Sequence, residues 1–210
     1  YLPLFAKGAL SAFALTEPGV GSDPANMSTT AVTDENGDWI LNGTKLWCTN
    51  GNIADVIVVM ARTPAIVKNG REINQISAFI VETDTPGFQV LHRSRFMGLK
   101  AIENGIIRFV DLKVPKENLV GGEGKGLRLA LTTLNDGRLS IPAIGAQSMI
   151  EIGAFMTRWA KTREQWGKVI GEHEAGAEKL AQITAGAYAM ETFSNYCAAL
   201  SDMGDRDLRM

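Results

Sequence analysis

Residues 16–23, T-E-P-G-V-G-S-D, combine hydroxyl, carboxylate and glycine residues in a pattern that could bind a ligand. A glycine-rich turn of this kind can present backbone N–H groups to an anion or to the polar edge of a ring. Thr16 and Ser22 add hydroxyl groups that can donate directed hydrogen bonds. The same composition is typical of an ordinary surface turn, so the segment alone leaves both interpretations open.

Residues 42–51, N-G-T-K-L-W-C-T-N-G, form a second polar segment with a strand-like centre. Because alternate residues of a strand point to opposite faces, Trp47 and Thr49 should share one face and Cys48 should occupy the other. An indole on that face could cover a flat ligand, but tryptophan is as often a core or hairpin aromatic. Asn42-Gly43 lies between two short apolar runs and predicts a two-residue hairpin turn.

A third polar group, Asn135-Asp136-Gly137-Arg138, lies within a segment of helical periodicity. A glycine inside a helix costs about 1 kcal/mol relative to alanine, which suggests a packing or ligand reason for Gly137. Arg138 could organise carboxylate or thioester oxygens. It could instead pair at the surface with a neighbouring acid such as Asp136.

The composition limits the ligands that these segments can bind. The 210 residues include 21 basic and 23 acidic side chains without a basic block, so we expect no nucleic-acid partner. Two separated cysteines (Cys48, Cys197) and two histidines (His92, His173) predict neither a disulfide scaffold nor a metal site. No apolar run approaches the roughly 20 residues of a transmembrane segment. We therefore expect a soluble protein that binds a small ligand.

The elements that position these segments change in kind near residue 120. Before it, short β-rich runs alternate with turn residues such as Asn69-Gly70 and Pro86-Gly87, which predicts an antiparallel β-barrel or sandwich. The runs cover residues 39–41, 56–60, 76–81 and 106–110. After residue 120 the apolar period becomes helical, so the predicted fold class is α+β, with part of an up-down helical bundle.

Two long helices are predicted in the C-terminal half. Apolar residues recur at helical spacing from Leu127 to Phe155, and Pro142 should kink this helix. A second helix is expected from near Glu172, and two helices cannot bury such apolar faces alone, which predicts a larger bundle or an oligomer. The predicted domains are 1–10 (the end of an N-terminal helical domain), 11–120 (the β-domain) and 121–210 (a truncated C-terminal bundle).

Together, T-E-P-x-x-G-S-D and N-G-x-K-x-W-x-T-N resemble the flavin motifs of acyl-CoA dehydrogenases. The resemblance covers nearly the whole chain and implies an FAD cofactor, with Trp47 over the flavin face away from the substrate and the Thr49 hydroxyl near flavin N5. Hydrogen bonds at the flavin's pyrimidine edge stabilise the negative charge that the ring gains on reduction. The cofactor-binding residues implied in the β-half are Phe13, Leu15, Thr16, Gly21, Ser22, Trp47, Cys48 and Thr49.

The resemblance extends into the helical half. Residues 162–168, T-R-E-Q-W-G-K, match the family's R-x-x-F-G turn, which would reach FAD held mainly by a neighbouring subunit. Residues 102–104, I-E-N, depart from the family, which commonly has Ser-x-Thr there. The further cofactor-binding residues implied are Arg163, Gln165 and Trp166, and the substrate-binding residues are Ser22, Asn135, Asp136, Gly137 and Arg138.

The implied reaction is α,β-dehydrogenation of an acyl-CoA, with electrons passing to electron-transfer flavoprotein. The usual base would be a glutamate C-terminal of Met210, because Gly137 occupies the alternative position and cannot abstract a proton. The resemblance also implies a homo-oligomer, a dimer or tetramer, in the cytoplasm if bacterial or the mitochondrial matrix if eukaryotic. An acyl-CoA oxidase, a flavin monooxygenase on the same scaffold and a non-catalytic binding or assembly protein are the alternatives.

Overall fold

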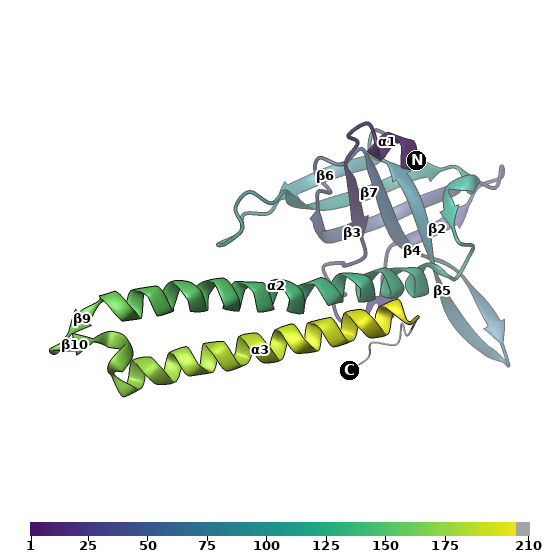
Figure 1. Ribbon diagram of the computed structural model, residues 1–210. Coiled ribbons are helices and arrows are strands. Elements are labelled where there is room, and N and C mark those ends of the chain that lie inside the picture. Colours follow the sequence, from purple (N-terminus) through teal and green to yellow (C-terminus); the bar gives the residue numbers. More distant parts are fainter. Residues whose placement is uncertain (205–210) are drawn as a thin grey trace. The chain divides into compact units, whose positions relative to one another are not determined.

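The computed structural model describes residues 1–204, and the side chains of all of these except Asp136. The chain divides into two compact units, Tyr1–Leu131 and Thr132–Met210, which we call the β-unit and the helical unit (Figure 1). The β-unit contains one large sheet, and the helical unit contains most of two long helices. The predicted α+β class is therefore confirmed.

An eight-stranded sheet forms the β-unit, and its strands follow the order β6-β7-β3-β2-β4-β5-β8, with β1 paired to β4. The pairs are mainly antiparallel, as predicted, but β1 and β2 both run parallel to β4. All four predicted runs lie within strands, and the path runs from an edge at β6 to an edge at β8. The strands are β1 (Ser11–Ala14), β2 (Thr30–Thr33), β3 (Trp39–Thr49), β4 (Val56–Lys68), β5 (Arg71–Glu82), β6 (Phe88–Arg93), β7 (Asn104–Val114) and β8 (Leu119–Val120).

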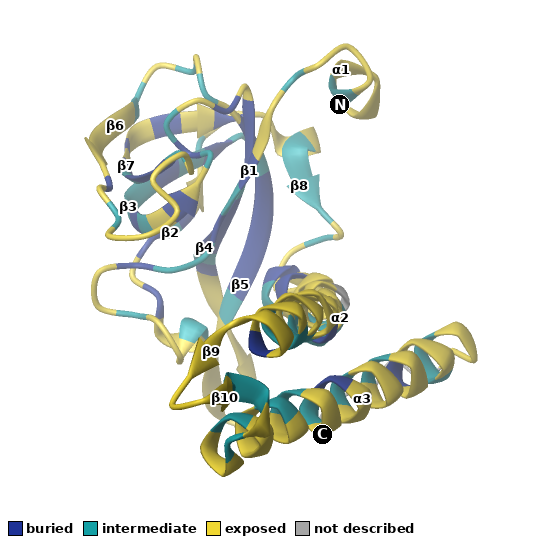
Figure 2. Cartoon of the chain, turned by 60° about the vertical axis from the view of Figure 1, so that its left-hand side comes forward, coloured by how far each residue is buried: buried dark blue, intermediate teal, exposed yellow. Residues whose placement is uncertain are grey.

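The core of the β-unit forms where inward-facing side chains of these strands meet, and the buried residues of β4 and β5 stand out in Figure 2. In one cluster the Trp39 ring contacts Phe79 edge-on, with the ring centroids 5.2 Å apart. A second cluster contains Met60, and the partly buried Phe13 and Leu15 pack against it. Phe13 and Leu15 thus fix β1 and the start of the following loop to the core.

The predicted hairpin turn at Asn42-Gly43 is wrong, because β3 runs through both residues. The pairing of β3 with β7 shifts register there, and the Asn42 side chain exchanges two hydrogen bonds with Asp111, at 3.0 and 2.8 Å. Gly43 serves close packing instead of a turn, since a Cβ at this position would lie 2.7 Å from the Cα of Thr29. The same dipeptide at residues 69–70 does form the predicted turn, with positive φ at both residues, between β4 and β5.

Two antiparallel helices form most of the helical unit. Helix α2 (Gly126–Thr162) continues through Pro142, and α3 (Glu174–Asp202) packs against it. Glycines permit the close approach: a Cβ on Gly145 would touch Met190, and one on Gly153 would touch Ile183. A short hairpin of β9 (Glu164–Gln165) and β10 (Lys168–Val169) joins the helices. The four-residue helix α1 (Leu2–Phe5) lies in the other unit.

Helices α2 and α3 leave large apolar side chains exposed. They include Ile141, Ile144, Phe155, Trp159, Tyr188, Phe193 and Tyr196. Among the described helices, α2 alone is long and apolar enough to cross a membrane. The core helix of a soluble protein can be equally long and apolar. The helix pair leaves much of its apolar surface exposed, and the larger bundle or oligomer stays a prediction.

Candidate functional site

A buried ion pair joins the loop after β1 to strand β3. Lys45 Nζ lies 2.9 Å from Glu17 Oε1 and donates a further hydrogen bond to the backbone oxygen of Leu15, at 3.0 Å. The Glu17 carboxylate also accepts hydrogen bonds from the backbone N–H groups of Ser28 (2.6 Å) and Thr29 (3.0 Å). Both charged side chains are at most 1% exposed. We call this arrangement the Glu17–Lys45 anchor.

Burial, hydrogen bonds and mutual attraction shift the pKa values of both groups in the Glu17–Lys45 anchor. Burial alone would raise the pKa of Glu17, but the hydrogen bonds from Ser28 and Thr29 and the charge of Lys45 outweigh it and lower the pKa to about 2. Burial also lowers the pKa of Lys45, and the Glu17 carboxylate opposes that shift. Because a lone buried charge costs several kcal/mol, each partner keeps the other in place. The loop is thereby held to β3.

The loop held by the Glu17–Lys45 anchor presents the polar groups predicted to bind FAD. Gly21 and Ser22 are exposed, and a Cβ at Gly21 would meet no atom within 4 Å. Among the described residues, no side-chain hydrogen bond occupies the hydroxyl of Thr16 or of Ser22. Leu46 N donates to Thr16 O at 2.9 Å, which places the loop directly beside β3. The structure thus brings the two sequence motifs together.

A β-bulge turns Trp47 and Thr49 outward from β3. Lys45 pairs with Ile107 and Cys48 pairs with Gly105, so two residues of β3 oppose one residue of β7. Trp47 takes a left-handed backbone, with φ 58°, is 55% exposed, and stacks on Phe96 with the ring centroids 5.9 Å apart. Thr49 is also exposed.

Cys48, between these two residues, faces the opposite way, into the core, where burial raises the pKa of its thiol to about 11. Its side chain therefore does not face a ligand beside Trp47 and Thr49, and the predicted contact of Cys48 with the cofactor could involve only its backbone. The predicted division of Trp47 and Thr49 from Cys48 agrees with the structure.

The Thr49 hydroxyl has a neighbour that the sequence did not assign to the site. Asn104 lies opposite Thr49 in the pairing of β3 with β7, and its Nδ2 donates to Thr49 Oγ1 at 3.1 Å. Next to it, Glu103 accepts two hydrogen bonds from Arg93, both at 2.7 Å, and one from Asn52, also at 2.7 Å. Glu103 and Asn104, in the segment that departs from the family pattern, thus tie β7 and the preceding loop to the end of β3.

The helical unit places the second predicted cofactor segment at the turn between its helices. Trp166 and Gly167 both have positive φ, at 52° and 78°, and form a two-residue turn between β9 and β10. Trp166 is 90% exposed and meets His173 edge-on, with the ring centroids 5.8 Å apart. His173 Nε2 lies 3.0 Å from the backbone oxygen of Gln165, so the histidine braces the turn. Arg163 and Gln165 are both exposed.

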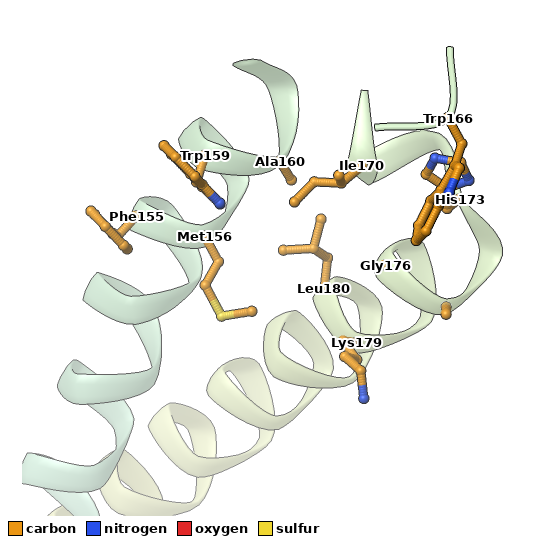
Figure 3. A pocket seen from close by; sticks show the side chains of 11 residues that line it. Phe155, Met156, Trp159, Ala160, Trp166, Ile170, His173, Gly176, Lys179 and Leu180 are labelled. Carbon is orange, nitrogen blue, oxygen red and sulfur yellow. The ribbon is translucent and has the colours of Figure 1, made fainter. Parts of the chain in front are cut away.

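An apolar pocket of about 340 Å³ lies behind this turn, between the ends of α2 and α3. In Figure 3, Met156, Ile170 and Leu180 point into the space between the helices, and Trp166 and His173 stand together at one end. The lining contains no acidic side chain, so the pocket offers no carboxylate for proton abstraction.

Residues 135–138 lie within α2, as predicted. Arg138 donates to Asn135 Oδ1 at 2.7 Å and is exposed. A Cβ at Gly137 would meet no atom within 4 Å, so packing against described residues does not explain this glycine. The predicted substrate contact by Asp136 falls on a side chain outside those described.

Comparisons with known proteins cover both units. Residues 12–112 match the model of the acyl-CoA dehydrogenase middle domain, and residues 124–210 match that of the acyl-CoA dehydrogenase C-terminal domain. The chain belongs to the acyl-CoA dehydrogenase family. This family member is 48% identical to the probable acyl-CoA dehydrogenase FadE10 of Mycobacterium tuberculosis, over 100% of this chain and 32% of that protein.

Solved acyl-CoA dehydrogenase structures share its fold. The butyryl-CoA dehydrogenase of Megasphaera elsdenii superposes with a TM-score of 0.85 at 32% identity, over 97% of this chain and 52% of the other. An acyl-CoA dehydrogenase complexed with FAD, from Bacillus anthracis, gives 0.81 at 38% identity, over 92% of this chain and 33% of the other. The chain thus spans between a third and about half of the length of these relatives.

The residues of this acyl-CoA dehydrogenase family member suit a flavin. An exposed indole and an exposed hydroxyl stand side by side on β3, next to a loop whose backbone and hydroxyls are open. With Asn104 donating to Thr49 Oγ1, the Thr49 hydroxyl proton is left for an acceptor such as a ring nitrogen. Within residues 1–204, no three His, Cys, Asp or Glu side chains gather as metal ligands would. The arrangement therefore fits an organic ring better than a metal ion.

Proposed function

We propose that this chain forms the flavin-binding part of an FAD-dependent acyl-CoA dehydrogenase, which introduces an α,β double bond into an acyl-CoA thioester. The observation that carries the proposal is the exposed face of Trp47 and Thr49 beside the loop held by the Glu17–Lys45 anchor. Membership of the acyl-CoA dehydrogenase family supports it. When bound, FAD supplies the electron acceptor of the reaction.

The surroundings of each side chain in the β-unit suggest its task. Trp47 would cover one face of the ring and exclude water, while the Thr49 hydroxyl would donate a hydrogen bond to N5. The Thr16 and Ser22 hydroxyls and the backbone at Gly21 bind polar groups of the cofactor, and Ser22 also lies near the acyl-CoA. Phe13 and Leu15 support this loop from the core.

The helical unit supplies contacts to a second subunit and to the substrate. Arg163, Gln165 and Trp166 reach FAD held mainly by a neighbouring protomer of a dimer or tetramer. Residues 135–138 border the acyl-CoA, and the carboxylate that removes the α proton lies C-terminal of Met210. Reduced enzyme passes its electrons to electron-transfer flavoprotein, in the cytoplasm or in the mitochondrial matrix.

Anaerobic bleaching tests the proposed activity. The full-length polypeptide is expected to purify yellow. An acyl-CoA of suitable length should reduce its bound flavin and remove the flavin absorbance at roughly 450 nm. Short, medium and long acyl chains should be compared, because the chain supplies only part of the pocket. A flavin spectrum that no acyl-CoA changes would contradict the dehydrogenase and favour a non-catalytic binding protein. Rapid reoxidation by oxygen would favour the oxidase or the monooxygenase.

Replacing Trp47 is expected to weaken FAD binding with little effect on the fold. Because asparagine tolerates a left-handed backbone, Trp47→Asn removes the indole without adding strain. Losing a large aromatic contact of this kind costs about 2 kcal/mol, or roughly a 30-fold loss of affinity. The affinity of FAD for the apoprotein, measured by flavin fluorescence, checks this.

Cys48→Ala is the control, because its side chain lies in the core. This variant should lose about 1 kcal/mol of stability and keep its FAD affinity within roughly twofold, a limit set by the small net energy of one contact. Equal losses of FAD affinity in both variants would contradict the proposed geometry of β3.

A further inference from the structure

The Asn104 side chain has an environment that strand packing alone does not explain. Asn104 is 4% exposed, and its only side-chain hydrogen bond among the described residues runs from Nδ2 to Thr49 Oγ1, at 3.1 Å. Its Oδ1 is buried and has no partner within residues 1–204. A buried carbonyl without a partner costs about 1–3 kcal/mol. Because Asn104 carries this cost, the one side-chain hydrogen bond that it does make needs a functional explanation.

The backbone fixes Asn104 directly across from Thr49. The two residues are partners in the pairing of β3 with β7. On one side of the pair, Ser94 N donates to Asn104 O at 2.7 Å, and on the other Asn50 N donates to Glu103 O at 2.8 Å. Glu103 is in turn held by Arg93 and Asn52. The amide of Asn104 therefore meets Thr49 from a rigid position.

The direction of this hydrogen bond decides what Thr49 can offer to a ligand. A threonine hydroxyl has one proton to donate and two lone pairs to accept with. An amide that donates to Oγ1 uses one lone pair and leaves the proton free to point elsewhere. Thr49 is exposed, so its proton can point out of the sheet.

We propose that Asn104 is a positioning residue that keeps the Thr49 hydroxyl as a hydrogen-bond donor to N5 of the flavin. This inference rests on the proposed function, because it needs FAD beside Thr49. Asn104 does not touch the cofactor; it acts through Thr49 alone. A donor at N5 acts differently on the two redox states of the ring, because N5 accepts a hydrogen bond in the oxidised ring and carries a hydrogen of its own after two-electron reduction. Asn104 thereby influences the balance between oxidised and reduced flavin.

A double-mutant cycle on the full-length, FAD-loaded polypeptide tests this. The variants are Thr49→Val, Asn104→Leu and the combination of the two, and the readout is the equilibrium between oxidised and reduced flavin, titrated anaerobically against a reference dye. We expect Thr49→Val to shift the equilibrium between the oxidised and reduced forms about tenfold, which is about 30 mV for a two-electron couple. Asn104→Leu alone should shift it at least about threefold in the same direction, as the net energy of one hydrogen bond allows. In the Thr49→Val background, Asn104→Leu should shift it no further.

Three results would overturn the role of Asn104. The first is a wild-type equilibrium in Asn104→Leu while Thr49→Val is shifted, and the second is an equal shift by Asn104→Leu in both backgrounds. An unshifted Thr49→Val would also overturn it, because Thr49 would then not lie at N5. If Asn104→Leu does not fold, Asn104→Ala is measured in its place with the same expectations. Failure of the proposed function is distinct, since the wild-type protein would then bind no FAD at all.

Discussion

Replacing Lys45 by methionine is expected to destabilise the β-unit by about 3–5 kcal/mol, the cost of leaving one buried charge without its partner. In Lys45→Met the Glu17 carboxylate keeps its hydrogen bonds from Ser28 and Thr29 but loses the ammonium group 2.9 Å away. The loop that Lys45 ties to β3 through Leu15 O should then open. We therefore expect loss of stability and loss of FAD retention together.

Hydrogen–deuterium exchange measures this change where it occurs. The protected amides of β3 and β4 should exchange more than about a hundredfold faster in Lys45→Met than in the wild type, since each factor of ten corresponds to 1.4 kcal/mol. Lys113→Met is the matched control. Lys113 pairs with Asp34 and Asp38 at 2.8 and 3.1 Å, but its side chain is 50% exposed. Such a surface pair contributes about 0–1 kcal/mol, so similar losses in the two variants would contradict the role of the Glu17–Lys45 anchor.

Acid is expected to remove the contribution of Glu17 to stability between about pH 4.5 and pH 2. The pKa of Glu17 is lowered in the folded chain from 4.5 to about 2, so the unfolded chain binds the proton more readily. The stabilisation is therefore fully present above about pH 4.5 and is lost as the pH falls through about 2. At 1.36 kcal/mol for each pKa unit, it amounts to about 3 kcal/mol.

Urea unfolding of the wild type and of Glu17→Gln across this range isolates that group. The variant should be less stable than the wild type at pH 6, and the difference should shrink as the pH falls. Hydrogen bonds from Lys113 and Arg93 lower the pKa values of Asp34 and Glu103, but these acids titrate in both proteins and cancel in the difference. A difference in unfolding free energy that stays constant down to pH 2 would show that Glu17 keeps an ordinary pKa.

Local sequence signals predicted the elements better than the way they combine. The β-runs and the turn at residues 69–70 were predicted, because alternation and paired positive φ act over a few residues. Asn42-Gly43 carries the same turn signal, yet β3 continues through it. The reason is Thr29, which lies 14 residues before Gly43 in the sequence and leaves no room for a side chain at Gly43. Contacts of this kind are set by tertiary packing.

The candidate site shows the same division. Spacing alone placed Trp47 and Thr49 on one face, whereas the two polar segments were linked only by the resemblance to the family. The Glu17–Lys45 anchor was not predicted, because nothing in either segment shows that both charges are buried. An acid in one motif and a lysine in the other were nevertheless a usable signal for an ion pair between the two segments. Asn104 was noticed only as a departure from the family pattern, since its register against Thr49 depends on a bulge that the sequence does not reveal.

That bulge makes the length of β3 as important as its composition. Lys45 faces the core and Trp47 faces out, although residues two apart in a regular strand share a face. Deleting Leu46, the single residue between them, would remove the bulge and give regular alternation, with the tryptophan still facing out and the cysteine still facing in. Point substitutions in this strand therefore act one side chain at a time, whereas an insertion or deletion elsewhere in β3 would exchange the inner and outer surfaces of the segment beyond it.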